Sequence, residues 1–402
     1  MESVILDWLN LVVRWTHVIT GIAWIGSSFF FMWLDAHLEA PGPGKEGVEG
    51  ELWMVHSGGF YEVNKFQVVP TAIPRTLHWF KWEAGFTGIS GLILLAIVYY
   101  LGAEAFLIDT DVADLTRLQA VAIGVGTLVV GWFAYDGLFA SRFGQQNMLI
   151  ANTISVIVLC LVAVGLSQLF TGRAAYVHVG ALVGIVMVIN VFVRIIPAQR
   201  NLIAARNAGD EPDPTLGKRA KQRSVHNNYL TLPVVFIMIS SHYPMTFGHP
   251  QGWFLLIAIS ISGALVRHWF NLRNASTPAI WPIPAAVVIF IAVAAWASLP
   301  TLQAERSAAS AEAVSFSKVR SIIDARCIVC HAARPTYEGF DVAPKNIRFD
   351  APAEVRKHAA AIKKTTVDTN TMPLGNVTEM TNEERQLLGG WIRAGANIEL
   401  AK

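Results

Sequence analysis

Long apolar stretches follow one another through the first three quarters of the chain, separated by shorter polar segments. A helix needs about 20 apolar residues to cross the hydrocarbon core of a bilayer, and eight of the stretches approach that length. This pattern predicts an all-α fold, a polytopic membrane helix bundle of about eight transmembrane helices. The expected spans lie near residues 8–34, 76–101, 118–140, 147–170, 174–196, 226–246, 251–270 and 279–299.

The apolar pattern ends at residue 299, and charged residues become frequent soon afterwards. Residues 300–314 are rich in Ala and Ser, which indicates a linker. Residues 315–402 have a helical pattern of apolar positions and are expected to form a soluble domain. The sequence therefore predicts a transmembrane domain at 1–299 and a C-terminal domain at 315–402, joined by that linker.

Two segments outside the apolar stretches carry signals of local order. Thr381 and Glu384 form a predicted capping box at the start of a helix that ends near Arg393, with Gly395 as its stop signal. The long segment 35–75 is rich in Gly and Glu but also contains several aromatic side chains. We therefore expect it to be ordered rather than a flexible spacer.

Composition supports the membrane assignment and narrows the classes of function. Hydrophobic residues make up 53% of the chain and charged residues only 15%, against about 25% charged residues in typical soluble proteins. No basic stripe occurs outside one loop, so nucleic-acid binding is not expected. The first residues include Glu2 and Asp7 and the first apolar stretch is long, a combination that does not predict a cleaved signal peptide.

The charges of the loops predict an orientation in the membrane. If the N-terminus lies outside, basic residues concentrate in the cytoplasmic loops, which is the positive-inside pattern, and the outer loop 102–117 is acidic. Eight spans then return the C-terminal domain to the outer side. The cytoplasmic loops hold Lys45, Lys65, Arg142, Arg200, Arg206, Lys218, Arg219, Lys221, Arg223 and Arg273, whereas the short outer loops hold Arg117 and Arg173.

The segment Cys327-Ile-Val-Cys330-His331 is a c-type haem attachment sequence. Two thiols one helical turn apart bond to the two vinyl groups of the haem, and the following histidine supplies an axial imidazole to the iron. The other axial position usually takes a methionine thioether, which raises the reduction potential. Met372 is the expected ligand because it precedes a proline in an extended loop, and Met380 is the alternative.

Two other interpretations of the cysteine motif are weaker. A zinc site needs a second pair of ligands at similar spacing, and His358 alone is poor support for one. A thioredoxin-like pair would need neither His331 nor the methionine loop. Haem is attached to such motifs on the outer side of the bacterial inner membrane, so both termini are expected in the periplasm. Cys160 lies alone in an apolar stretch and is expected to be a buried hydrophobic residue.

Ionisable residues inside membrane spans are costly and are candidates for function. The first span carries His17, with Gly21 and Trp24 on the same helix face. An imidazole beside a glycine that opens space suits an axial haem ligand, although a hydrogen bond between helices would also explain it. A b-type haem held by His17 and either His178 or His242 is therefore a second candidate cofactor.

A further group of ionisable residues lies toward the cytoplasmic ends of four spans. An anionic substrate would need Arg or Lys donors, together with a carboxylate or histidine as base. The alternative is that Arg194 and Arg267 are helix-end residues whose long side chains reach the membrane interface. That explanation suits the carboxylates of Glu83 and Asp136 less well, because carboxylate side chains reach the interface poorly. The candidate substrate-binding residues are Lys81 and Arg267, and the candidate catalytic residues are Glu83, Asp136 and His78.

Residues 14–33 (RWTHVITGIAWIGSSFFFMW) and 78–85 (HWFKWEAG) form two distinctive motifs. They resemble motifs of the bacterial integral-membrane, cytochrome c-linked urate oxidase (urate hydroxylase) family, whose layout of eight spans and one cytochrome c domain also matches. The first span is similar as well to that of membrane protoporphyrinogen oxidases and copper-resistance membrane proteins, in which a first-helix histidine binds haem b. That similarity favours His17 as a ligand.

The resemblance implies an oxidoreductase that converts urate to 5-hydroxyisourate without forming hydrogen peroxide. Electrons would pass to haem c, attached at Cys327 and Cys330 with His331 and Met372 as axial ligands, and then to a respiratory oxidase or a soluble cytochrome. The resemblance assigns no residue to the urate site. Alternatives are an electron-transfer cytochrome subunit without a substrate of its own, a redox-gated transporter or sensor, and an oxidase of another substrate such as a porphyrinogen.

Overall fold

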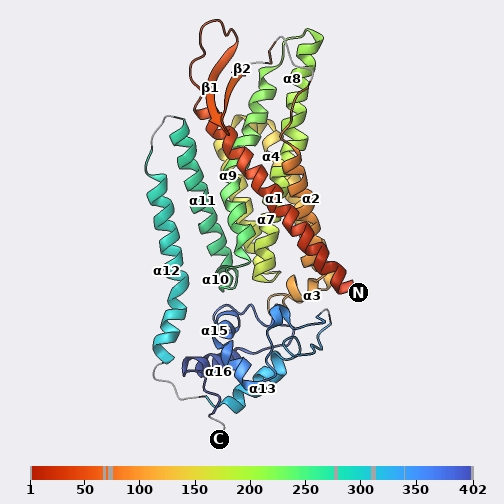
Figure 1. Cartoon of the computed structure of the whole chain (residues 1–402), viewed down its shortest axis with the longest axis vertical. Helices are drawn as coiled ribbons and strands as arrows, with labels where there is room; N and C mark the ends of the chain where they lie inside the picture. Colours follow the sequence, from red (N-terminus) through yellow and green to blue (C-terminus); the bar gives the residue numbers. More distant parts are fainter. Residues whose placement is uncertain are drawn as a thin grey trace.

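The computed structural model shows a helical bundle with a small helical domain at one end, the docking end, and a β-hairpin at the other, the hairpin end (Figure 1). The N-terminus lies at the docking end, the same end as the C-terminal domain. The described residues are 2–66, 69–70, 76–275, 279–308, 314–338 and 340–399.

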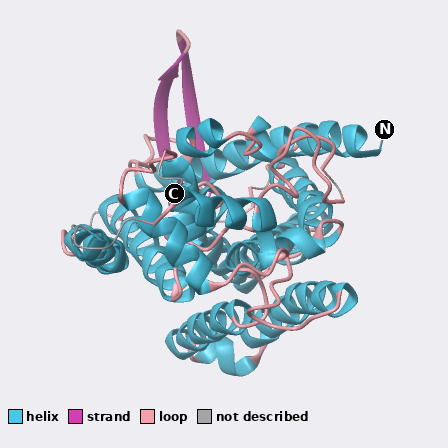
Figure 2. Cartoon of the chain, turned by 90° about the horizontal axis from the view of Figure 1, so that it is seen from below, coloured by secondary structure: helices cyan, strands magenta, loops and turns pink. Residues whose placement is uncertain are grey.

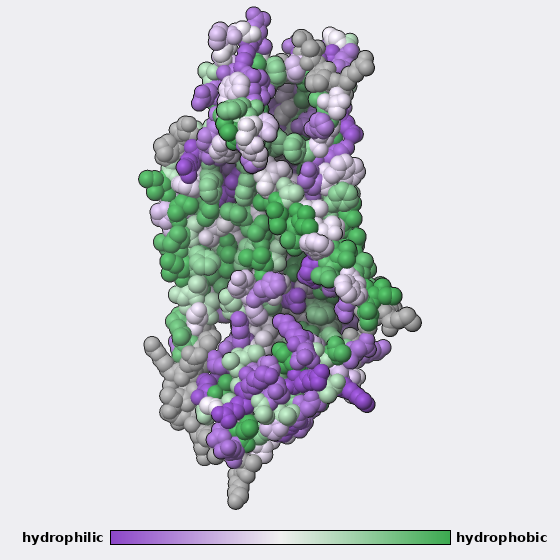
Figure 3. All heavy atoms as spheres, in the orientation of Figure 1, coloured by the Kyte–Doolittle hydropathy of each residue, from purple (hydrophilic) through white to green (hydrophobic). Residues whose placement is uncertain are grey.

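Long helices make up the bundle and confirm the main part of the predicted fold. Among the described residues, seven helices are long and apolar enough to cross a membrane, and Figure 3 shows a band of hydrophobic residues across the middle of the visible face. The helices of this part are α1 (Glu2–Ala36), α2 (Trp82–Leu95) with its π-helical extension η1 (Ala96–Tyr100), α3 (Ala103–Phe106), α4 (Arg117–Ala140), α5 (Arg142–Gln146), α6 (Met148–Ser167), α7 (Gly172–Ile189) continued through η2 (Asn190–Ile195) into α8 (Ile196–Ala208), α9 (Pro214–Ser240), α10 (Pro244–Phe247), α11 (Gly252–Asn274) and α12 (Pro282–Ala308).

Helix α9 departs from the hydropathy prediction. The expected span 226–246 falls on the second half of α9 and on α10, and α9 is not among the seven described helices that are apolar enough to cross a membrane. It nevertheless packs against α7 and α11 and buries polar side chains, including Asn227 and Thr231. If α9 also crosses the bilayer, the number of passes is even, in agreement with both chain ends lying at the docking end.

Helix α7 contributes much of the bundle core, where Tyr176 is almost fully buried. Glycines allow its neighbours to approach closely. A Cβ on Gly180 would lie 2.5 Å from the side chain of Ile237 in α9, and a Cβ on Gly131 of α4 would lie 2.5 Å from Leu182. Such small residues promote helix association in an apolar environment, where van der Waals packing takes the place of the hydrophobic effect.

Segment 35–75 is ordered where it is described, as expected, but it contains a β-hairpin that corrects the all-α prediction. Strands β1 (Val48–His56) and β2 (Gly59–Phe66) pair antiparallel. Ser57 and Gly58 join them with φ angles of 51° and 79°, as in the two-residue turns that match strand twist. The Val, Trp, Tyr and Phe residues of this segment favour strands. Figure 2 shows the hairpin standing out from the helices.

Helix α12 extends into the predicted linker at 300–314. The helix continues to Ala308, and residues 309–313 lie outside the described part of the chain. The stretch that composition indicated as a linker contains Ala, Leu, Gln, Glu and Arg, all of which favour a helix. The connection to the C-terminal domain is therefore helical over more than half of the predicted linker.

The C-terminal domain is helical and has a core of its own, in which Leu388 and Trp391 are almost fully buried. The predicted capping box of Thr381 and Glu384 is present at the start of α16, and Gly395 follows the helix with a φ of 95°. These local predictions are confirmed. The elements are α13 (Phe316–Arg326), η3 (Pro344–Asn346), α14 (Pro352–Lys357), α15 (Ala359–Ile362), η4 (Lys363–Val367), η5 (Leu374–Asn376) and α16 (Asn382–Arg393).

Candidate functional site

The cysteine motif of the C-terminal domain forms a turn directly after α13. The backbone N–H groups of Cys330 and His331 both donate to the carbonyl of Cys327, at 3.2 and 2.9 Å, and both cysteines are free thiols. Nδ1 of His331 lies 2.9 Å from the carbonyl oxygen of Ile347, so Nδ1 carries the proton and Nε2 remains available as a ligand. This donor set fits a covalently attached haem with an axial imidazole.

The surroundings of the two thiols disfavour the thioredoxin-like interpretation. Burial raises the pKa of Cys327 to about 12 and also raises the pKa of Cys330, whereas a reactive thioredoxin-like pair needs a lowered pKa.

The two candidate methionine ligands lie in different environments. Met372 is only partly buried, in the loop between η4 and η5, where its N–H donates to Thr365 and its carbonyl accepts from Arg385. Met380 is 3% exposed and packs in the core of the domain. A side chain committed to the core is less suited to reach an iron, so the placement favours Met372.

Replacing Met372 with alanine is expected to lower the reduction potential of the attached haem, because a thioether ligand raises it. Met380→Ala is the matched control. It should cost about 2–5 kcal/mol of unfolding free energy and leave the potential close to that of wild type. Potentiometric titration and thermal unfolding of both variants measure these effects. A potential that falls only in Met380→Ala would instead identify Met380 as the ligand.

The C-terminal domain touches the bundle through residues 369–376, the docking segment, which contains Met372. Nδ2 of Asn376 donates to a carboxylate oxygen of Asp111 at 2.6 Å. A Cβ on Gly375 would lie 2.6 Å from the carbonyl oxygen of Ile108, and the φ of Gly375 is 56°. The candidate iron ligand is thus part of the loop that is pressed against the bundle.

Within the bundle, the predicted catalytic residue Asp136 of α4 is held by two arginines. Arg194 Nε donates to its carboxylate at 2.8 Å, and Arg223 Nη2 of α9 does so at 3.0 Å. Arg223 is buried, and its guanidinium also lies over the ring of Tyr135. This ion pair gives Asp136 a structural role, and a catalytic role for it stays a prediction.

Next to this ion pair lies a network of neutral polar side chains that sequence reasoning missed. Nδ2 of Asn190, at the start of η2, donates to the hydroxyl of Tyr135 at 3.1 Å and to Oδ1 of Asn227 at 2.9 Å. The hydroxyl of Tyr135 also lies 2.8 Å from Nδ1 of His226. The one signal in the sequence was an asparagine inside a long apolar run, together with the pair Asn227–Asn228.

Arg267 of α11, a predicted substrate-binding residue, is only 4% exposed. Its Nε donates to Oδ1 of Asn228, and its guanidinium carbon lies 4.3 Å from the ring centroid of Phe29 in α1. Asn228 in turn donates to Asn271 at 2.9 Å. Among the described residues Nη2 of Arg267 has no hydrogen-bond partner, so this buried cation retains a free donor.

The remaining predicted residues of this group lie at the start of α2. His78 is exposed in the segment before the helix, and Nζ of Lys81 lies 5.3 Å from the ring of Trp82. Oε2 of Glu83 is buried without a partner in the described part of the chain. The hydrogen bonds and ion pairs of the described residues do not connect these side chains to Arg267 or to Asp136.

The histidines proposed for a b-type haem lie on separate parts of the bundle. Nδ1 of His17 lies 3.0 Å from the carbonyl of Thr87, and its ring packs on Gly91. His178 is fully buried, and its Nδ1 donates to the carbonyl of Ala174 at 2.8 Å. His242 is exposed after α9. Contacts of the described residues do not bring His17 to either partner, and a haem b stays a prediction.

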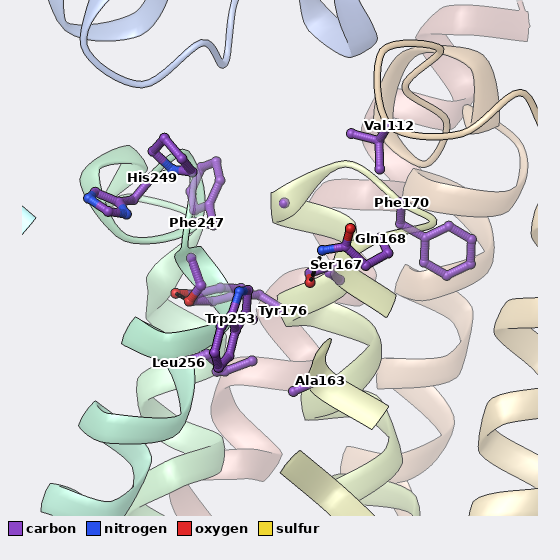
Figure 4. Close-up of a pocket in the computed structure, with 14 residues that line it drawn as sticks. Val112, Ala163, Ser167, Gln168, Phe170, Tyr176, Phe247, His249, Trp253 and Leu256 are labelled. Carbon is purple, nitrogen blue, oxygen red and sulfur yellow. Dashed lines mark hydrogen bonds between the residues drawn. The ribbon is translucent and has the colours of Figure 1, made fainter. Parts of the chain in front are cut away.

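A cavity of about 170 Å³ lies at the docking end of the bundle (Figure 4). It forms where α6 ends and α7 and α11 begin, and ribbon of the C-terminal domain, in blue, lies beyond it at the top of the figure. Aromatic rings make up much of its wall. The lining residues are Val112, Ala163, Ser167, Gln168, Phe170, Gly172, Ala175, Tyr176, Phe247, His249, Pro250, Gly252, Trp253 and Leu256.

Comparison with known families concerns this bundle. The family model described as urate oxidase N-terminal matches residues 3–298. The chain belongs to this urate oxidase family. No match was found among curated proteins or among solved structures. The matched region ends inside α12, so the C-terminal domain with the cysteine motif lies beyond it.

In a member of a urate oxidase family, the oxidoreductase chemistry is expected in the bundle, because the bundle makes up the matched region. Its matched region contains the Asp136 ion pair, the buried guanidinium of Arg267 and the cavity at the docking end. The charged side chains around Asp136 and Arg267 and the partly aromatic cavity are thus two candidate sites in the same matched region.

Proposed function

We propose that this protein is a membrane-bound urate oxidase that converts urate to 5-hydroxyisourate and passes the electrons to a haem c in its C-terminal domain. The family match over residues 3–298 carries the proposal, and the seven apolar helices support a place in a lipid bilayer. In this reaction urate and one water molecule give 5-hydroxyisourate, two protons and two electrons. Oxygen is not consumed, so hydrogen peroxide does not form.

The haem c would accept these electrons one at a time and release them to a respiratory oxidase or a soluble cytochrome. Cys327 and Cys330 would hold it covalently. His331 would offer Nε2 to the iron, in an orientation fixed by the hydrogen bond from its Nδ1 to the carbonyl of Ile347. Met372 would be the second protein ligand of the iron. The docking segment keeps this site against the bundle, where the substrate would react.

The proposed location is the inner membrane of a bacterium, with both termini in the periplasm. The N-terminus and the C-terminal domain lie at the same end of the bundle, which supports a common side for both. The basic residues of the opposite loops favour the cytoplasm for the hairpin end. An acceptor in the periplasm or the membrane would then reach the C-terminal domain directly.

Purified protein with a full complement of haem is expected to reduce its own haem when urate is added without oxygen. The electrons have no other acceptor under these conditions, so visible spectroscopy follows them, and chromatography follows the loss of urate. A peroxide assay in air should stay blank. Haem that stays oxidised with urate would refute the proposal, and reduction by a quinol alone would favour the electron-transfer subunit.

A further inference from the structure

We propose that the cavity at the docking end is the urate site, a binding site for a small anionic heteroaromatic ring. This inference rests on the function proposed above and specifies where its substrate reacts. The sequence predictions placed the substrate near Lys81 and Arg267, toward the hairpin end. The size, charge and position of the cavity favour the docking end.

The size and walls of the cavity suit a small planar ring system. Its volume of about 170 Å³ lies below the roughly 300–1,000 Å³ of pockets for drug-sized ligands. It exceeds the roughly 150 Å³ of an engineered cavity that binds benzene. A porphyrin or a quinone with its tail would be too large. Trp253, which is half-buried, supplies an aromatic surface against which a purine can stack, and the almost fully buried rings of Tyr176 and Phe247 also line the cavity.

The backbone around the cavity favours an anion. Gly172, the first residue of the 18-residue helix α7, and Gly252, the first residue of the 23-residue helix α11, both line it. The dipole of a helix N-terminus stabilises negative charge, and two such termini meet here, against the single helix C-terminus of α6 at Ser167. None of the lining residues is acidic. Urate is a monoanion at neutral pH, so its charge matches this end of the cavity.

The polar side chains of the cavity complement an oxidised purine. The amide of Gln168 can donate and accept at once, as the N–H and C=O groups along the edge of urate require. Its contact with Ser167 is long, at 3.5 Å, so a ligand can replace it. Nδ1 of His249 accepts from the N–H of Gln251 at 3.0 Å. Burial lowers the pKa of His249, which favours a neutral ring with its proton on Nε2.

The position of the cavity links it to the candidate haem site. Gly248 lies between two lining residues, and a Cβ on Gly248 would lie 2.4 Å from the carbonyl oxygen of Thr369 in the docking segment. Thr369 precedes Met372, the expected iron ligand, by three residues. Because electron tunnelling weakens steeply with distance, a substrate beside this contact is well placed to lose electrons to the haem.

The rival position at Arg267 lies much farther from the C-terminal domain. Arg267 follows Gly252 by 15 residues along α11, and a rise of about 1.5 Å per residue places it roughly 22 Å from the start of the helix. Electrons released there would have to cross most of the bundle. The contacts around Arg267 join it to α1 and α9 and hold the helices together.

The reaction in the cavity balances without any further reagent. Water adds to C5 of urate, and two protons leave to solvent. Gln168 and the aromatic side chains would hold the ring, and the helix N-termini would hold its charge. A haem c held by Cys327, Cys330, His331 and Met372 would supply the route for the two electrons, one at a time, to the respiratory oxidase or soluble cytochrome named above.

Gln168→Ala and Trp253→Leu test the site. Each is expected to raise the KM for urate-driven haem reduction at least tenfold and to leave haem reduction by ascorbate unchanged. Gln168 is exposed at the rim, so its substitution should not affect folding. Gln145→Ala is the matched control, because Gln145 lies in α5, outside the cavity, and donates to the carbonyl of Ala140 at the end of α4. Its KM should equal that of wild type.

The outcomes separate the inference from the proposed function. If wild type reduces its haem with urate while both cavity variants keep the wild-type KM, the cavity is not the substrate site, although the function stands. A rise in KM confined to Arg267→Gln would place urate at the other half of the bundle and overturn the inference. If wild type shows no reduction with urate, the proposed function itself fails.

Discussion

Replacing both Cys327 and Cys330 with alanine is expected to remove all covalently bound haem and to abolish electron transfer from urate to an external acceptor. Both thiols are free and lie on one turn beside His331, which fits two thioether bonds to one porphyrin. A pyridine haemochrome spectrum of acid-acetone-extracted protein measures the loss, since extraction removes only haem that is not covalently attached.

Cys160→Ala is the control for this double variant. Cys160 lies in α6, outside the C-terminal domain, so its removal should leave covalent haem and turnover at wild-type levels. Haem that survives extraction in the double variant would show that the attachment site lies elsewhere. The electron route proposed here would then lose its first acceptor.

Replacing Asp136 with asparagine is expected to destabilise the bundle by about 3–5 kcal/mol, because it leaves the buried Arg223 without its counter-charge. Arg223 is 4% exposed, and the carboxylate of Asp136 is its partner at 3.0 Å. Thermal unfolding in detergent, followed by circular dichroism, measures the effect. Asp114→Asn, at an exposed position before α4, should change stability by less than about 0.5 kcal/mol.

A double variant identifies the cause of the Asp136 effect. Removing both charges in Asp136→Asn/Arg223→Gln should recover much of the lost stability, since breaking a buried pair costs more than replacing it. If Asp136→Asn loses less than about 1 kcal/mol, the ion pair contributes little to stability. Asp136 would then again be a candidate for proton transfer in the reaction.

Much of the bundle could be predicted from sequence because the apolar length of a segment does not depend on its neighbours. Helices α4 and α6 begin and end within three residues of the expected spans 118–140 and 147–170. The cap at Thr381 is equally local. Only the second half of α9 could be predicted in this way, as the span 226–246, since its first half is rich in Lys and Arg. The hairpin was missed because a Gly- and Glu-rich composition hides the β-branched and aromatic residues of its strands.

The candidate site was predictable only where charge marked it. Asp136 and Arg267 stand out as ionisable residues inside apolar stretches, and both are partly or fully buried in the bundle. Asn190 and Asn227 are neutral, and their hydrogen bond joins positions 37 residues apart, so no local pattern reveals it. The cavity could not be predicted from the sequence at all, because Gly172 and Gly252 come together there only after the helices have packed.

The polarity of α9 has a consequence for biogenesis. The segment that contains Arg223, His226, Asn227 and Asn228 is unfavourable to insert into the bilayer by itself. Each of these polar groups would face lipid without a hydrogen-bond partner. Partners for these groups are supplied by α4 and η2, which are synthesised earlier, and by α11, which is synthesised later. Integration of α9 should therefore be delayed until the ribosome has delivered α11, so that the two helices enter the bilayer as a pair.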